Sequence, residues 1–136
     1  MLDVGGGSGA HAIGAVTHWP HLRAVVFDLE PVCEVAREFI AKAGLQDRIE
    51  TQSGDMWEDP FPEADLHFYS NIYHDWSREK GAVGFTILML VWSADGGQYS
   101  GRELSEMLTD AGFRQIETKP TFGYHSIVTG VKPAAP

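Results

Sequence analysis

The chain has 136 residues, 43% of them hydrophobic, which is enough for one globular domain with a real core. Its 19 acidic and 10 basic residues give a net charge of −9, and no basic run occurs, so neither nucleic acid nor an anionic membrane is an expected partner. Cys33 is the single cysteine, no signal peptide is recognisable and no apolar run could span a bilayer, which together predict a cytoplasmic location.

The chain opens with a short apolar stretch that runs into a glycine-rich turn, Gly5–Gly9, and then into a helical pattern near Ala10. This order is typical of a nucleotide-binding α/β sheet, in which glycines let the backbone approach a ligand and the helix N–H groups face it. The turn alone leaves a nicotinamide cofactor, a phosphate ligand and S-adenosylmethionine open. No Gly-Lys-Ser/Thr follows, which excludes a Walker loop.

The following segments alternate between strand and helix patterns. We expect a helix to about Thr17, a strand at 23–28, a helix from Pro31 to about Ala43, and strands at 48–52 and 64–70. This alternation predicts a parallel, doubly wound sheet, whose ligands bind at the carboxyl ends of the strands. Further along the chain we expect a helix from Asp75, a buried helix within 81–92, a helix capped by Ser100 and an antiparallel hairpin within 113–132.

Two acids follow strands of the predicted sheet. Asp28 lies 19 residues after Gly9, and its carboxylate can accept hydrogen bonds from ribose hydroxyls or can cap the next helix. Asp55 follows the third strand, where it can accept from an adenine amino group while Met56 packs on the ring, or can belong to an ordinary turn. Both positions fit an adenosine-containing ligand.

His74, in the motif His74-Asp75-Trp76, follows the fourth predicted strand. An imidazole titrates near neutrality, so a histidine beside the predicted ligand can take a proton from a hydroxyl, although a lone histidine is more often structural. Asp75 can cap the following helix, and Trp76 can form a wall of the site. The six histidines show no tight spacing with an acid or a thiol, so we predict no metal site.

Five motifs, in this order, resemble the S-adenosylmethionine-dependent O-methyltransferases of the caffeate and hydroxyindole type. Bacterial members of that group act on polyketide, phenazine or carotenoid-like hydroxyls in secondary metabolism. The resemblance runs from Leu2 to Lys132 and implies a Rossmann-like class I methyltransferase sheet with a C-terminal antiparallel hairpin. The motifs are Asp3-Val-Gly-Gly-Gly-Ser-Gly9, Phe27-Asp28-Leu29, Gly54-Asp55-Met56, Ile72-Tyr-His-Asp-Trp76 and Ala111-Gly-Phe113.

The resemblance implies S-adenosylmethionine as the cofactor and a role for each candidate residue. His74 matches the general base, which would deprotonate a phenolic or enolic hydroxyl, and 85–92 matches a helix that lines the acceptor pocket. Ser70 matches a position where plant members carry a cofactor-contacting lysine. For the cofactor, the turn of Gly5, Gly7 and Gly9 would lie under the methionine part, Asp28 would hold the ribose, Leu29 would lie beside the adenine, and Asp55 and Met56 would bind the adenine.

The sequence departs from the family pattern in two places. Family members are homodimers with an N-terminal dimerisation region before the glycine turn, so we interpret 1–136 as one catalytic domain without that region. Between Lys80 and Gly81 a few dozen family residues are missing, including the fifth strand, which is central in the order 3-2-1-4-5-7-6. Of the two acids that orient the family's catalytic histidine, one falls in this gap and the other aligns with Gln98.

Three functions remain open at this point. The first is methyl transfer from S-adenosylmethionine to a hydroxyl of a small aromatic or polyketide-like acceptor, with His74 as the base. The missing strand and acids motivate the second, a non-catalytic remnant that binds only the cofactor or a partner. The ambiguous turn motivates the third, a NAD-dependent oxidoreductase, against which the His-Asp-Trp and Gly-Asp-Met motifs argue.

Overall fold

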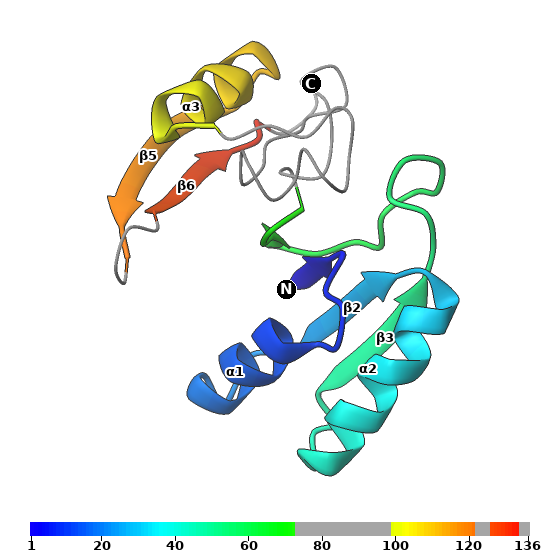
Figure 1. Cartoon of the computed structure of the whole chain (residues 1–136). Coiled ribbons are helices and arrows are strands. Elements are labelled where there is room, and N and C mark those ends of the chain that lie inside the picture. Colours follow the sequence, from blue (N-terminus) through cyan, green and yellow to red (C-terminus); the bar gives the residue numbers. More distant parts are fainter. Residues whose placement is uncertain (73–98, 122–125, 134–136) are drawn as a thin grey trace. The chain divides into compact units, whose positions relative to one another are not determined.

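The computed structural model of the chain describes residues 1–72, 99–121 and 126–133 (Figure 1). They belong to two compact units, Met1–Ile72 and Tyr73–Pro136, and each unit is described by itself. The candidate cofactor residues all belong to the first unit, whereas His74, Gln98 and 85–92 lie outside the described residues.

A four-stranded parallel sheet forms the centre of the first unit (Figure 1). Its strand order is β3-β2-β1-β4, and Asp3 of β1 pairs with Val26 of β2 on one side and with Phe68 of β4 on the other. This arrangement confirms the predicted parallel α/β sheet. The strands are β1 (Leu2–Val4), β2 (Ala24–Asp28), β3 (Ile49–Ser53) and β4 (His67–Tyr69).

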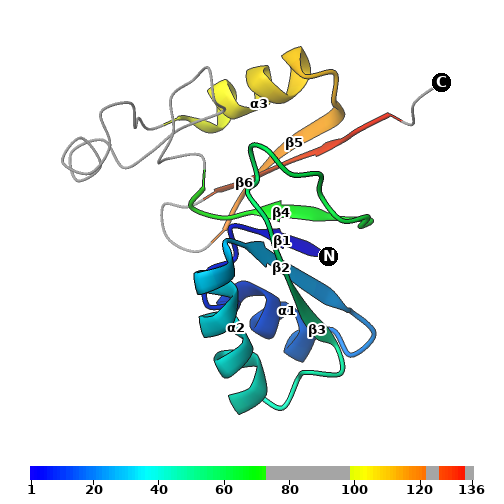
Figure 2. The same ribbon diagram turned by 90° about the vertical axis from the view of Figure 1, so that its right-hand side faces the viewer.

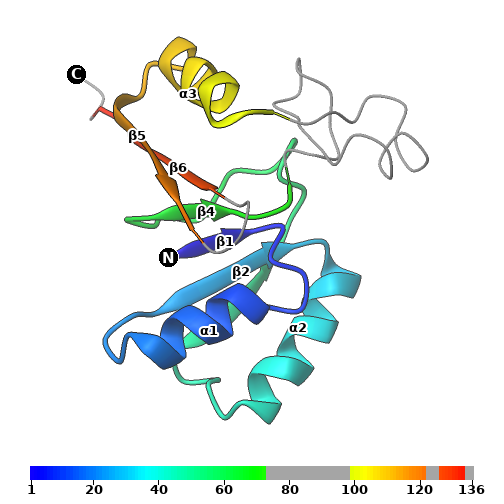
Figure 3. The same cartoon turned by 60° about the vertical axis from the view of Figure 1, so that its left-hand side comes forward.

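Two helices, α1 (Ala10–His18) and α2 (Glu30–Lys42), lie together on one face of this sheet (Figures 2 and 3). Pro31 stands in the first turn of α2, where its missing N–H group costs no helical hydrogen bond, and Gly44 just beyond the helix has a positive φ of 68°. The helices and the sheet enclose a core of Ala12, Val16, Ala24, Val26, Ala36, Ile40 and Ile49.

The connection from β3 to β4, residues 54–66, contributes to the other face of the sheet. Its Met56 and Ala64 pack against a second buried cluster of Leu2, Val4 and Phe27. Because α1 and α2 lie on one face and this connection packs on the other, the chain changes face between β1 and β4. Open α/β sheets bind their ligands at such a switch point, beyond the carboxyl ends of the strands.

The second unit contains helix α3 (Gly101–Asp110) and the antiparallel pair β5 (Arg114–Pro120) and β6 (Ser126–Val131). The Ser100 hydroxyl accepts a hydrogen bond from the Glu103 amide at 3.3 Å, while the Glu103 carboxylate accepts one from the Ser100 amide at 2.8 Å. These reciprocal bonds satisfy two amides at the helix start. The predicted capped helix and C-terminal hairpin are therefore confirmed.

Strand β4 is shorter than the predicted strand at 64–70. The Leu66 carbonyl still accepts the Leu2 amide at 2.7 Å, but the chain bends at Asp65, where it returns from the second face of the sheet. In the described part of the first unit the sheet neighbour of β4 is β1, so the missing fifth strand stays a prediction. Among the described helices, none has the length and hydropathy needed to cross a membrane.

Candidate functional site

The glycine-rich turn lies between β1 and α1, at the carboxyl edge of the sheet. Gly5, Gly7 and Gly9 have φ values of 61°, 58° and 76°, a region that a side chain strongly disfavours. A Cβ on Gly5 would also lie only 2.2 Å from the Cδ1 atom of Ile72. The three glycines singled out in the sequence are therefore required by the path of the turn itself.

Gly7 differs from its neighbours because it faces open space. A Cβ added there would meet no atom within 4 Å, whereas one on Gly6 would lie 2.9 Å from the Asp3 side chain and from Val26. The open side of Gly7 is thus a place where a ligand can approach the backbone closely, which is what a glycine cradle requires.

Asp28 lies at the end of β2 and holds the turn. Its Oδ2 atom accepts the Gly7 amide at 2.9 Å, and its Oδ1 atom accepts the Leu29 amide at 2.8 Å. The helix cap considered for Asp28 is not what the structure shows, because the N-cap position of α2 is Leu29 and has no side-chain cap. A carboxylate offers about four acceptor positions, so two backbone donors leave room for ribose hydroxyls.

Asp3 lies beside the glycine turn, and the sequence interpretation gave it no role of its own. Its side chain is 1% exposed, and its Oδ2 atom accepts the Ala12 amide at 3.2 Å, which ties β1 to the first turn of α1. Burial raises the pKa of the Asp3 carboxyl and the nearby Asp28 charge raises it further, whereas His11 and the Ala12 hydrogen bond lower it. The sequence did contain one signal for this position, namely an acid inside an otherwise apolar strand.

Asp55 and Met56 lie after β3, where the Gly54 amide donates to the Asp28 carbonyl at 3.0 Å. The Asp55 carboxylate accepts the Trp57 amide at 2.8 Å, as in an ordinary turn, and Met56 is partly buried against the second cluster. These contacts bring the third strand end next to Asp28. The adenine-binding roles of both residues stay predictions.

Ser70 and Leu29 complete the set of predicted cofactor residues. Ser70 directly follows β4, and its hydroxyl accepts a long hydrogen bond of 3.5 Å from the side-chain amide of Asn71, which has a positive φ of 56°. Leu29 is 54% exposed beside Asp28, so its side chain is available to a flat apolar ring. Their cofactor roles also stay predictions.

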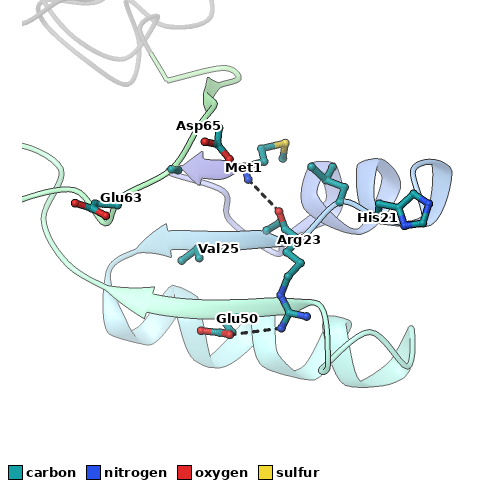
Figure 4. A pocket seen from close by; sticks show the side chains of 10 residues that line it. Met1, His21, Arg23, Val25, Glu50, Glu63 and Asp65 are labelled. Atoms are coloured by element: carbon teal, nitrogen blue, oxygen red, sulfur yellow. Dashed lines mark hydrogen bonds and ion pairs between the residues drawn. The ribbon is translucent and has the colours of Figure 1, made fainter. Parts of the chain in front are cut away.

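A pocket lies at the opposite, amino edge of the same sheet (Figure 4). There the Met1 ammonium donates to the Arg23 carbonyl at 2.9 Å, and Arg23 lies 4.0 Å from Glu50. Ligands of open α/β sheets bind at the carboxyl edge, so we place the functional site at the glycine turn. The pocket is lined by Met1, His21, Leu22, Arg23, Ala24, Val25, Glu50, Glu63, Ala64 and Asp65.

These features fit an adenosine-containing cofactor. A glycine cradle open at Gly7, an acid at the end of β2 and a second acid after β3 all stand at the carboxyl edge of a sheet with order β3-β2-β1-β4. Within the described residues no group of three His, Cys, Asp or Glu side chains could hold a metal ion. The fold and the site define an α/β protein with an open parallel sheet and a glycine-rich turn of the kind that nucleotide-binding sheets carry.

Comparison with known proteins identifies the family. Residues 1–85 match the family model of the O-methyltransferase domain, and the chain belongs to this family. It is 32% identical over 97% of its length to 3-hydroxy-5-methyl-1-naphthoate 3-O-methyltransferase of Streptomyces sahachiroi, of which it covers 48%. This membership favours methyl transfer over the nicotinamide-dependent alternative.

Two solved structures agree with this result. An O-methyltransferase family 2 protein of Planctomyces limnophilus, in complex with apigenin, matches with a TM-score of 0.86 and 27% identity over 97% of this chain and 50% of that chain. Human N-acetylserotonin methyltransferase, in complex with S-adenosylmethionine, matches with a TM-score of 0.79 and 25% identity over 97% and 47% of the two chains. The chain thus spans about half the length of the relatives that it matches.

Proposed function

We propose that this chain is the cofactor-binding part of an S-adenosylmethionine-dependent O-methyltransferase that acts on a hydroxyl of a small aromatic or polyketide-like acceptor. One observation carries the proposal, namely the glycine turn that is bonded to Asp28 at the switch point of the sheet. Membership in the O-methyltransferase domain family supports the reaction class. The naphthoate substrate in the Streptomyces relative's name and the apigenin in the Planctomyces structure support the acceptor class.

The chain's own residues suggest how the cofactor is held. The open side of Gly7 admits the methionine part, and Asp28 offers its remaining acceptor positions to the ribose hydroxyls. Leu29 presents an exposed apolar side chain next to Asp28. Asp55, Met56 and Ser70 stand at the neighbouring strand ends, where we expect the adenine and the rest of the cofactor.

His74 is the proposed general base, a role that rests on the motif because the residue lies outside the described part of the chain. When bound, the cofactor supplies an electrophilic methyl group attached to a sulfonium. His74 would take the proton of the acceptor hydroxyl as the oxygen forms its bond to that methyl group. General bases of this kind contribute roughly 10²–10⁴-fold to a rate.

The first experiment is a calorimetric titration of the chain with S-adenosylhomocysteine. We expect saturable one-to-one binding that is weakened about 10–100-fold by Asp28→Ala, since hydrogen bonds to a charged group are removed. Asp47→Ala is the matched control, because Asp47 is an exposed acid at the amino edge of the sheet, and it should leave the affinity unchanged. A folded chain that binds no S-adenosylhomocysteine would overturn the proposal.

The second experiment tests the base. His74→Gln should reduce methyl transfer to hydroxylated naphthoates or flavones about 10²–10⁴-fold while leaving the affinity for S-adenosylhomocysteine within about twofold. Full turnover by this variant would remove His74 from the mechanism. Binding without any turnover by the unmodified chain would instead support the non-catalytic alternative. A dimerisation region and a cytoplasmic location are still predictions, and this experiment does not depend on them.

A further inference from the structure

The buried carboxylate of Asp3 lies next to the glycine turn of the proposed cofactor site. Asp3 is 1% exposed, and its Cγ atom lies close enough to the turn that a Cβ on Gly6 would approach it to 2.9 Å. Its Oδ2 atom accepts a hydrogen bond from the Ala12 amide at 3.2 Å. An acid is expensive to bury, and an amide side chain could accept the same hydrogen bond without that expense. The position therefore calls for an explanation that involves charge.

Two other charged groups act on Asp3. The Asp28 charge raises the pKa of the Asp3 carboxyl, and the two acids meet the glycine turn at neighbouring residues, Asp28 at the Gly7 amide and Asp3 close to Gly6. His11, an exposed residue in the first turn of α1, lowers that pKa. The His11 ring packs edge-on against Phe68 with 5.3 Å between the ring centres, so β4 presents an uncharged ring to it and β1 presents Asp3.

We propose that Asp3 is a positioning residue whose buried charge makes the site favour the cationic sulfonium of S-adenosylmethionine over the neutral thioether of S-adenosylhomocysteine. The inference rests on the proposed function. In the transfer, the carbon–sulfur bond breaks as the oxygen–carbon bond forms, the sulfur keeps the electron pair, and the hydroxyl proton leaves to a base. The cofactor therefore loses one positive charge, and the attraction to Asp3 is lost with it.

Asp3→Asn separates charge from geometry, because the amide oxygen can still accept the Ala12 hydrogen bond. Calorimetric titrations with each ligand should show that this variant lowers the affinity for S-adenosylmethionine about tenfold more than the affinity for S-adenosylhomocysteine. A difference of this size is expected for one screened charge–charge interaction. Asp47→Asn removes the same charge at the amino edge and should leave the ratio of the two affinities unchanged. Both ligands carry the same amino and carboxylate groups, so any effect of the substitution on those groups cancels in the ratio of the two affinities.

The outcomes distinguish the two proposals. If the wild-type chain binds neither ligand, the proposed function fails and this inference fails with it. If both ligands bind and Asp3→Asn weakens them equally, the cofactor site stands but Asp3 acts only on the shape of the turn. A tenfold selective loss of S-adenosylmethionine affinity in Asp3→Asn, with an unchanged ratio in Asp47→Asn, would establish the inference.

Discussion

The Gly7 amide donates a hydrogen bond of 2.9 Å to the Asp28 carboxylate across 21 positions of the sequence. This bond joins the turn after β1 to the end of β2, so the two parts of the site cannot move independently without breaking it. Gly7 has a positive φ of 58°, and its open side meets no atom within 4 Å. Its conformational role and its proposed role beneath the cofactor can therefore be tested separately.

We predict that Gly7→Ala removes cofactor affinity out of proportion to its effect on stability. An alanine at a positive φ costs about 1–2 kcal/mol of unfolding free energy, and its methyl group would occupy the open cradle. Affinity for S-adenosylhomocysteine should fall at least about tenfold. The unfolding free energy is measured by urea denaturation and the affinity by calorimetry.

Gly44→Ala is the matched control for this prediction. Gly44 follows α2 with a φ of 68°, and a Cβ there also meets no atom within 4 Å. The conformational loss should be similar, about 1–2 kcal/mol, but the affinity should be unchanged. Equal losses of affinity in both variants would show that the cofactor does not use the open side of Gly7.

The stability of the chain should rise at neutral pH when Asp3 is replaced by asparagine. Burial raises the folded-state pKa of Asp3 above its ordinary value of 3.8, so the folded chain binds this proton more tightly than the unfolded chain does. The tighter binding of this proton stabilises the folded chain fully below pH 3.8, and this stabilisation is lost as the pH rises through the folded-state pKa of Asp3. At pH 7 the wild-type chain therefore bears the cost of ionised Asp3, and Asp3→Asn does not.

Urea denaturation of both chains between pH 3.5 and 8 measures this difference. We expect Asp3→Asn to be the more stable chain at pH 7, with an advantage that shrinks toward acid pH. The opposite order at pH 7 would mean that the His11 charge and the Ala12 hydrogen bond outweigh burial. A gain in stability combined with a loss of cofactor selectivity would show that the acid is retained for function.

The glycine turn and Asp28 were predictable because their signals are local in sequence. Positive φ values in the turn favour glycine whichever ligand binds there. An acid that ends an apolar strand stands at the carboxyl edge of a parallel sheet. The boundaries of α1, α2 and β2 followed from the same short-range rules, namely helical spacing, Pro31 and Gly44.

The surroundings of Asp3 and the length of β4 were not predictable in this way, although an acid inside an apolar strand was a signal that Asp3 is unusual. Nothing next to Asp3 in sequence reveals that Gly6, Ala12 and Asp28 enclose it, since these partners are brought together only by the folded sheet. The bend at Asp65 likewise depends on where the β3–β4 connection leaves the second face of the sheet. The apolar pattern at 64–70 carries no information about that position.

Cys33 should be unreactive in the folded chain. It is 0% exposed, and its thiol donates to the carbonyls of Asp28 at 3.4 Å and Gln52 at 3.5 Å. Burial raises the pKa of this thiol above its ordinary value, so the nucleophilic thiolate forms only at more alkaline pH. Labelling with an aromatic disulfide at pH 8 should be roughly 100-fold slower than in urea. Equal rates would show that the ends of β2 and β3 open readily.

Arg48 should contribute more to stability than any exposed ion pair of the first unit. Its Nη1 atom donates to the Val16 carbonyl at 3.0 Å and to the Pro20 carbonyl at 2.8 Å, so one cation satisfies acceptors at the end of α1 and in the loop beyond it. Hydrogen bonds from a charged donor contribute about 1.5–3 kcal/mol, and a cation also interacts favourably with the C-terminal end of a helix dipole.

Arg48→Met keeps most of the side-chain volume and removes the charged donor, so the unfolding free energy should fall by about 2 kcal/mol in urea denaturation. Arg23→Met is the matched control. The Arg23 guanidinium lies 4.0 Å from Glu50 with both side chains well exposed, a contact expected to contribute less than about 1 kcal/mol. Because α1 begins at the glycine turn and Arg48 contacts its other end, Arg48→Met should lower the affinity for S-adenosylhomocysteine less than Gly7→Ala does. A loss of stability no larger than that of Arg23→Met would show that solvent replaces Arg48 at these carbonyls.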